Sequence, residues 1–198
     1  SGRLAQQIEN GAPFDVFASA DVAYVERVIA AGAGDERTRR TYAFGRIVIW
    51  SDGPRHPDLK ALADPSIAPI AVANPAHAPY GVAAVTALRR AGVYDAVAPR
   101  LVYGENVSDA LRLASSGNAD AAIVALSLAI ASDGDWTLID DSFHDPLEQA
   151  LVVTAPPERA AGARGFADFI GGPEGRRVMR RYGFLLPGDP APATAGRR

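Results

Sequence analysis

Two short stretches of the sequence combine residue types that suit the binding of an anion. The first, "ANPAHAPYG" (residues 73–81), joins a β-type run to a helical run, and the second, "GENVSDAL" (residues 104–111), does the same. A helix that begins directly after a strand presents backbone N–H groups and the positive end of the helix dipole. Together these can hold an oxyanion without any lysine or arginine. Both stretches are therefore candidate anion sites.

Several residues in these stretches have an expected part in such a site. Gly81 follows Tyr80 and leaves room where a ligand would approach. In the second stretch Asn106 or Ser108 caps the helix, with the N–H of Val107 in its first turn. The same residues also fit ordinary strand-to-helix connections, which are routine in α/β proteins. The spacing of these residues alone does not distinguish an anion site from an ordinary strand-to-helix connection.

The elements that position these stretches alternate along the chain. Apolar and β-branched runs predict strands at residues 14–20, 45–51, 67–74, 100–104, 119–127 and 149–155. Helical periodicity predicts helices at residues 3–10, 20–32, 56–66, 82–91, 106–117 and 159–184. Such alternation indicates an α/β architecture with largely parallel sheets, whose ligands bind where strands end and helices begin. Three junctions meet that condition, at residues 19–21, 74–81 and 104–108.

Familiar catalytic and metal-binding patterns are missing from the sequence. It has neither a phosphate-binding G-x-x-x-x-G-K-[ST] loop nor a G-x-S-x-G nucleophile elbow. Its histidines, His56, His77 and His144, are scattered without the spacing of metal ligands, and His77 is expected to matter least in its stretch. The acidic residues 133–142 are interpreted as a solvated loop. We therefore predict no catalytic residue, no metal site and no enzyme.

Composition sets further bounds on the class of protein. The 198 residues carry a formal net charge of −3, and 48% of them are hydrophobic, which suffices for a proper core. Without a basic patch, nucleic acid is not an expected partner. With no cysteine, the chain has no disulfides. No signal peptide is visible, and the Pro/Ala/Gly-rich residues 188–198 are expected to be a disordered tail.

Four segments, taken together and in order, resemble a known family. They are "SGRLAQQIENGAPFDVFASAD", "ANPAHAPYGVAAVTAL", "VYGENVSDALRLASSGNADAAIVALSL" and "RRYGFLLP". The chain resembles the periplasmic molybdate-binding proteins of ABC-type molybdate importers, over nearly its whole length to about residue 187. The family also has an N-terminal strand, an A-A-x-S-L-type turn and a helix, which we expect to be missing from this chain.

The resemblance implies a two-lobed type II periplasmic-binding-protein fold, an α/β fold with mixed, mostly parallel sheets and a ligand cleft between the lobes. Lobe one would consist of residues 1–49 and 151–187, and lobe two of residues 50–150. Residues 45–51 and 148–154 would then be the segments that cross between the lobes.

The family's ligand-binding positions transfer to three residues of this sequence. Ser1 matches the serine that donates its hydroxyl and N–H from lobe one. Tyr80 and Val107 match positions that contribute backbone N–H groups from lobe two. Some relatives place a ligand-binding tyrosine where this chain has Ala125, so that contact is expected to be lost.

The function implied by the resemblance is the binding of molybdate or tungstate by neutral hydrogen-bond donors, without a cofactor. The anion would be delivered to the membrane permease of an ABC importer by a monomeric protein in the periplasm. Three alternatives stay open from the sequence: a binder of another oxyanion such as sulfate, a sensor domain of a transcription regulator, and an enzyme that uses the same fold.

Overall fold

The protein consists of two compact units, as seen in a computed structural model that describes residues 1–53 and 57–189. Unit 1 comprises Ser1–Phe44 and Leu147–Asp189, and unit 2 comprises Gly45–Pro146. His56 and residues 190–198, which form most of the expected tail, lie outside the described residues. Residues 188 and 189 of the expected tail are described, and Asp189 forms an ion pair with Arg180 (2.8 Å).

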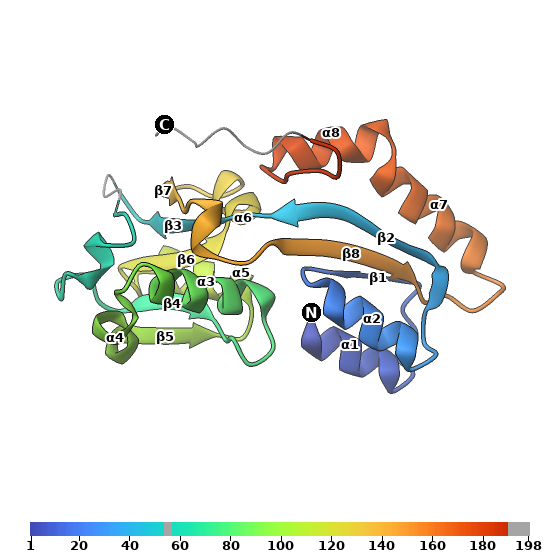
Figure 1. Cartoon of the computed structure of the whole chain (residues 1–198), viewed down its shortest axis with the longest axis horizontal. Coiled ribbons are helices and arrows are strands. Elements are labelled where there is room, and N and C mark those ends of the chain that lie inside the picture. Colours follow the sequence, from blue (N-terminus) through green and yellow to red (C-terminus); the bar gives the residue numbers. More distant parts are fainter. Residues whose placement is uncertain (54–56, 190–198) are drawn as a thin grey trace. The chain divides into compact units, whose positions relative to one another are not determined.

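Unit 1 is built on a three-stranded sheet with the order β1-β8-β2, covered by helices on both faces (Figure 1). The strands are β1 (Val16–Ser19), β2 (Asp35–Gly45) and β8 (Leu147–Val153), and β1 pairs antiparallel with β8. The helices are α1 (Gly2–Glu9), α2 (Val22–Ala30), α7 (Ala160–Gly171) and α8 (Pro173–Arg181). Strand β8 therefore brings a distant segment of the chain into the centre of the N-terminal unit.

Side chains of β8 divide the unit 1 core into two layers. Ala150 and Val152 pack with residues of α1 and α2, whereas Leu151 and Val153 pack with α7. Successive residues of a strand point to opposite faces of its sheet, so an apolar run is expected where both faces are covered. The burial of all five residues 149–153 agrees with this arrangement.

Strand β2 was not among the predicted strands. Its first half, "DERTRR", is charged and partly exposed, so it lacks the apolar pattern that identifies a buried strand. The strand lies at the edge of its sheet, next to β8, and Thr38 accepts a hydrogen bond from the Val153 N–H (2.9 Å). Its strand structure therefore depends on a neighbour more than 100 residues away in sequence.

The first residue of β2, Asp35, makes unit 1 sensitive to acid. Its carboxylate accepts hydrogen bonds from Arg37 (2.9 Å) and Arg164 (3.0 Å), which together lower its pKa from 3.8 to about 2. In the unfolded chain the carboxylate takes up a proton near its ordinary pKa, so its contribution is present above about pH 4 and is lost as the pH falls towards 2. We expect Asp35→Asn to lower the free energy of unfolding at pH 7, with a difference from wild type that shrinks between pH 5 and pH 3. Urea denaturation at several pH values measures this, and a difference that stays constant with pH would contradict it.

Unit 2 contains a five-stranded mixed sheet with the order β5-β4-β6-β3-β7. Parallel pairing joins β4 (Ile70–Ala73) to β5 (Leu101–Gly104) and to β6 (Ala121–Ala125). Strand β3 (Ile47–Ser51) pairs antiparallel with both β6 and β7 (Asp135–Leu138). The predicted α/β class with mixed sheets is thereby confirmed.

Helices α3 (Pro79–Arg90) and α5 (Val107–Ser115) both pack on this sheet. Ala110 and Ala114 of α5 contact a buried cluster that includes Ala71, Ala122 and Val124 from the middle of the sheet. These small side chains allow the helix to lie close to the strands. Short helices complete the unit: α4 (Tyr94–Val97), α6 (Leu126–Ile130) and the 3-10 turns Ala61–Ala63, Ala98–Arg100 and Asp141–Phe143.

Two sequence-based expectations for unit 2 were wrong. The acidic residues 133–142 are not simply a solvated loop, since they include β7, whose Trp136 pairs with Trp50 of β3. The helix expected at residues 56–66 is reduced, within the described residues, to the turn Ala61–Ala63. In both cases the segment is short, and local sequence is a weak guide to such segments.

None of the helices in the described part of the chain is both long enough and apolar enough to cross a membrane.

Candidate functional site

The carboxyl ends of three parallel strands lie at one edge of the unit 2 sheet. Strand β4 leads to α3, β5 leads to α5, and β6 leads to α6. Because these strands run in the same direction, the N-termini of the helices that follow them are brought to the same edge. Tyr80 and Val107 are both in the first turn of their helices, so the structure places these two predicted residues at this edge.

The N-terminus of α3 begins with Ala78 as the cap residue and Pro79 as the first helical residue. Proline suits that position because its fixed φ matches the helix and it has no N–H to satisfy. Ala78 has no side chain that can cap, and α3 has no side-chain cap hydrogen bond within the described residues. Tyr80, the second residue of the helix, is 8% exposed. The two prolines of "ANPAHAPYG" thus end the strand and start the helix within a few residues.

Gly81 was expected to leave room for a ligand, but its structural role is different. A Cβ atom at this position would lie 2.1 Å from the backbone oxygen of Ala73 and 3.0 Å from the nitrogen of Pro75. The glycine therefore lets the first turn of α3 approach the end of β4, and the space beside it is filled by the protein's own backbone. The expectation that Gly81 leaves room for a ligand was wrong.

Gly104 provides the same close approach at the second junction. A Cβ atom there would lie 2.5 Å from the backbone nitrogen of Ala110 in α5. The sequence "YGEN" thus brings the end of β5 directly against the helix that follows it. Each of the two junctions therefore has a glycine that sets how close the helix comes to its strand.

The N-terminus of α5 is capped by Asn106, which settles the choice between Asn106 and Ser108. The Asn106 side chain accepts a hydrogen bond from the Asp109 N–H (3.0 Å), and the Asp109 carboxylate accepts one from the Glu105 N–H (3.0 Å). This reciprocal pattern resembles a capping box. Within the described residues, no hydrogen bond is formed by the N–H of Val107 or of Ser108. The cap therefore leaves these two donors at the tip of the helix available.

The charged side chains of Asp109 and Arg112, near the N-terminus of α5, are paired with each other. Hydrogen bonds from the Glu105 N–H and the Arg112 guanidinium hold the pKa of Asp109 below its usual value. Arg112 donates to the same carboxylate at 2.6 and 2.9 Å. The donors at the tip of α5 are consequently neutral backbone groups.

His77 connects the two junctions. Its Nε2 lies 2.8 Å from the backbone oxygen of Glu105, and the Asn74 N–H donates to the Gly104 oxygen at 2.8 Å. The loop before α3 is thereby hydrogen-bonded to the loop before α5 at two successive positions. We had expected this histidine to matter least in its stretch, and spacing gave no indication of the contact because the partner lies 28 residues away.

Ser1 belongs to unit 1, whereas Tyr80 and Val107 belong to unit 2. Its hydroxyl oxygen accepts a hydrogen bond from the Ala20 N–H (3.0 Å), in the junction at residues 19–21. In the same junction the Ser19 hydroxyl donates to the Asp21 oxygen (2.7 Å), and Asp21 caps α2. Since a hydroxyl has one hydrogen to donate, the Ser1 hydroxyl keeps its donor while its oxygen accepts from Ala20.

Ala125 is the last residue of β6 and is 2% exposed. It lies at the same sheet edge as the starts of α3 and α5, and its methyl group supplies no hydrogen-bond donor. The expected loss of a tyrosine contact at this position stays a prediction.

His144 lies outside these two junctions. His144 is 4% exposed, and its Nδ1 is hydrogen-bonded to the Asp145 oxygen (2.8 Å). No group of three or more histidine, cysteine or acidic residues suited to a metal ion is found among residues 1–53 and 57–189.

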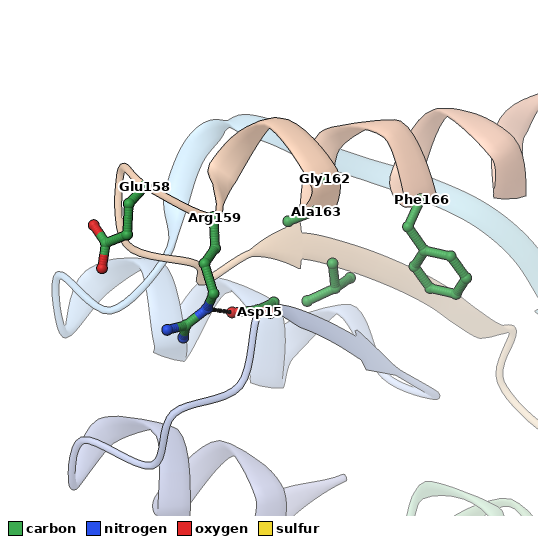
Figure 2. A pocket seen from close by; sticks show the side chains of 7 residues that line it. Asp15, Glu158, Arg159, Gly162, Ala163 and Phe166 are labelled. Carbon is green, nitrogen blue, oxygen red and sulfur yellow. Dashed lines mark hydrogen bonds and ion pairs between the residues drawn. The ribbon is translucent and has the colours of Figure 1, made fainter.

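A surface hollow in unit 1 contains none of the predicted ligand residues. Figure 2 shows it between the start of β1 and the start of α7, where Arg159 points to Asp15. The two side chains form an ion pair at 2.7 Å, so the guanidinium charge is already matched. Phe166 lines the same hollow and is 55% exposed. This hollow is therefore a poor site for an oxyanion.

Comparison with known proteins gives consistent matches over most of the chain. Residues 1–185 match the family model of bacterial extracellular solute-binding proteins. The molybdate-binding protein ModA of Rhodobacter capsulatus is 35% identical over 188 residues, which cover 93% of this chain and 74% of the relative. ModA of Escherichia coli is 32% identical over 201 residues, covering 94% of this chain and 76% of the relative.

The fold agrees with a solved structure from the same group. The periplasmic molybdate-binding protein of Azotobacter vinelandii superposes with a TM-score of 0.88 at 33% sequence identity, covering 94% of this chain and 84% of that one. The resemblance carried by the four sequence segments is thereby confirmed. The chain belongs to the bacterial extracellular solute-binding proteins and, within them, to the family of the molybdate-binding proteins.

Proposed function

We propose that this protein binds molybdate, and also tungstate, and delivers the anion to the membrane permease of an ABC importer. The observation that carries the proposal is the pair of helix N-termini at one edge of the unit 2 sheet, in a chain of this family. Tyr80 and Val107 lie in their first turns, and neither junction places an unpaired lysine or arginine at its tip. Such a site suits a small anion held by neutral donors.

We propose three residues as the ligands of the anion. Tyr80 and Val107 would donate backbone N–H groups, and Ser1 would donate its hydroxyl from unit 1. Burying a dianion costs many kcal/mol unless it is fully hydrogen-bonded, and each charge-assisted bond returns only about 1.5–3 kcal/mol. Several donors are therefore needed.

Neutral donors also suit a protein that must release its ligand. A buried lysine or arginine would add strong attraction to a dianion and slow its transfer to the permease. We propose that the protein works as a monomer in the periplasm, without a cofactor and without catalysis. The relatives named above are solute-binding proteins, which supports this assignment.

Titration calorimetry with molybdate, tungstate and sulfate tests the proposed function. We expect molybdate and tungstate to bind with similar affinity and sulfate to bind more weakly, because the three anions share charge and shape but sulfate is smaller. Heat from sulfate or from an organic acid, together with none from molybdate, would overturn the proposal and favour a different anion.

A further inference from the structure

We propose that His77 is a positioning residue that fixes the distance between the N-termini of α3 and α5, and with it the preference for a large oxyanion over a smaller one. The inference rests on the proposed function, because the two helix ends are taken to hold the anion. It assigns a specific task to a residue that is not itself one of the proposed anion ligands.

The contact has a defined direction. Because a backbone carbonyl oxygen can only accept, the Nε2 of His77 must carry the hydrogen that it donates to Glu105 at 2.8 Å. The imidazole therefore has a hydrogen on Nε2 whether it is neutral or protonated.

The contact lies just beyond the carboxyl ends of β4 and β5. Strands β4 and β5 are paired in parallel as far as Ala73 and Gly104, and the bond from the Asn74 N–H to the Gly104 oxygen (2.8 Å) follows directly. The bond from His77 to Glu105 is the next connection between the same two segments. It therefore ties the two loops together beyond the point where the strands end.

Each of the two loops has its own hydrogen bond close to this contact, and each leads directly into its helix. On one side, the Asn74 side chain accepts from the Ala76 N–H (3.0 Å), and His77 directly precedes Ala78, the cap residue of α3. On the other side, Glu105 is held through its N–H by Asp109, two residues before Val107. A change in the distance between His77 and Glu105 would consequently move the two helix tips relative to each other.

Selectivity is the property that such a connection controls. Molybdate and sulfate present the same tetrahedral arrangement of oxygens and the same charge, so a site distinguishes them by the spacing of its donors. A loosened pair of loops adapts to either anion. Loss of the connection should therefore reduce the affinity for molybdate more than that for sulfate.

The experiment compares wild type with His77→Ala and His77→Gln. We expect His77→Ala to weaken molybdate binding about five- to tenfold, the factor that corresponds to one lost hydrogen bond, and to lower the ratio of sulfate to molybdate dissociation constants. The amide nitrogen of glutamine reaches about as far as Nε2, so His77→Gln should restore both quantities to within about twofold. Calorimetry measures the affinities, and thermal unfolding verifies that the variants are folded.

A matched control removes a comparable bond at another place in unit 2. Asn118 donates to the Ser116 hydroxyl (2.8 Å) just before β6 begins, at the opposite end of that strand from Ala125. Asn118→Ala should leave both the affinity and the ratio unchanged. Equal affinities for wild type and His77→Ala, or an equal loss for both anions, would overturn the inference.

A measurement without any anion separates this inference from the proposed function. Amide hydrogen exchange at Asn74 and Glu105, whose N–H groups donate to Gly104 and to Asp109, should be faster in anion-free His77→Ala than in wild type, and should return to the wild-type rate in His77→Gln. If wild type bound neither molybdate nor sulfate, the proposed function would fail, and these exchange rates would still decide whether His77 holds the loops. Unchanged exchange in His77→Ala would overturn the inference.

Discussion

Val107→Pro is expected to weaken molybdate binding about 100-fold while the protein stays folded. The substitution removes the N–H of Val107, which forms no hydrogen bond within the described residues. One charge-assisted hydrogen bond contributes about 1.5–3 kcal/mol, which corresponds to roughly 10- to 150-fold in affinity. Titration calorimetry with molybdate measures the loss of affinity.

The local structure tolerates this proline. Position 107 is the first residue of α5, where proline is favoured, and the preceding Asn106 has φ −154° and ψ 178°, within the extended region that a residue before proline adopts. The helix and its cap should therefore persist, and far-UV circular dichroism should be unchanged. The proline removes a single donor at the tip of α5.

Val107→Ala is the matched control for this experiment. The alanine keeps the N–H and loses only part of a side chain that packs against the buried cluster of unit 2. We expect an affinity within about twofold of wild type and a loss of about 1 kcal/mol in the free energy of unfolding. A large loss of affinity from the alanine would show that the side chain, and not the backbone, makes the contact.

Gly81→Ala is expected to destabilise the protein by roughly 3 kcal/mol, at the upper end of the range for overpacked sites. The added Cβ atom would lie 2.1 Å from the Ala73 oxygen, and both groups belong to backbone that cannot rotate away. Helix α3 must therefore shift away from β4. For a chain of this size the shift in Tm is about 10 °C, which calorimetry or circular dichroism detects easily. Molybdate affinity should fall as well, because the N-terminus of α3 moves.

Gly165→Ala in α7 is a control that is expected to raise the free energy of unfolding, whereas Gly81→Ala is expected to lower it. A Cβ atom at Gly165 meets nothing within 4 Å, and the residue lies inside a helix, where alanine is intrinsically favoured over glycine. We expect a gain of about 0.5–1 kcal/mol. If Gly81→Ala were as stable as Gly165→Ala, the close approach of α3 to β4 would not be a constraint on the fold.

The prediction of secondary structure succeeded where local pattern and tertiary environment agree. The apolar runs of β3, β4, β6 and β8 are buried strands, and the helical stretches before and after them form α1, α2, α3, α5, α7 and α8. It failed at β2 and β7. Those strands have polar or half-exposed residues, and each depends on a neighbour that is distant in the chain, β8 for β2 and β3 for β7.

The candidate site shows a similar division. The strand-to-helix junctions, and the positions of Tyr80 and Val107 in the first turns of their helices, follow from turn and cap residues, which act over a few positions. The bond from His77 to Glu105 and the close approaches at Gly81 and Gly104 involve atoms that meet only when the sheet has formed. A glycine in sequence indicates freedom of the backbone, but it does not say what comes close to it.

Local sequence pattern was enough to predict the α/β class and the two junctions that begin with "NP" and "GEN", and four sequence segments were enough to identify the family. Tertiary structure decided that β8 completes the sheet of the N-terminal unit, that the two junctions share one edge of a parallel sheet, and that a histidine connects them. The physical reason is the range of the interactions. Caps, turns and periodicity are set by neighbours along the chain, whereas strand pairing and close backbone contacts are set by partners that only folding brings together.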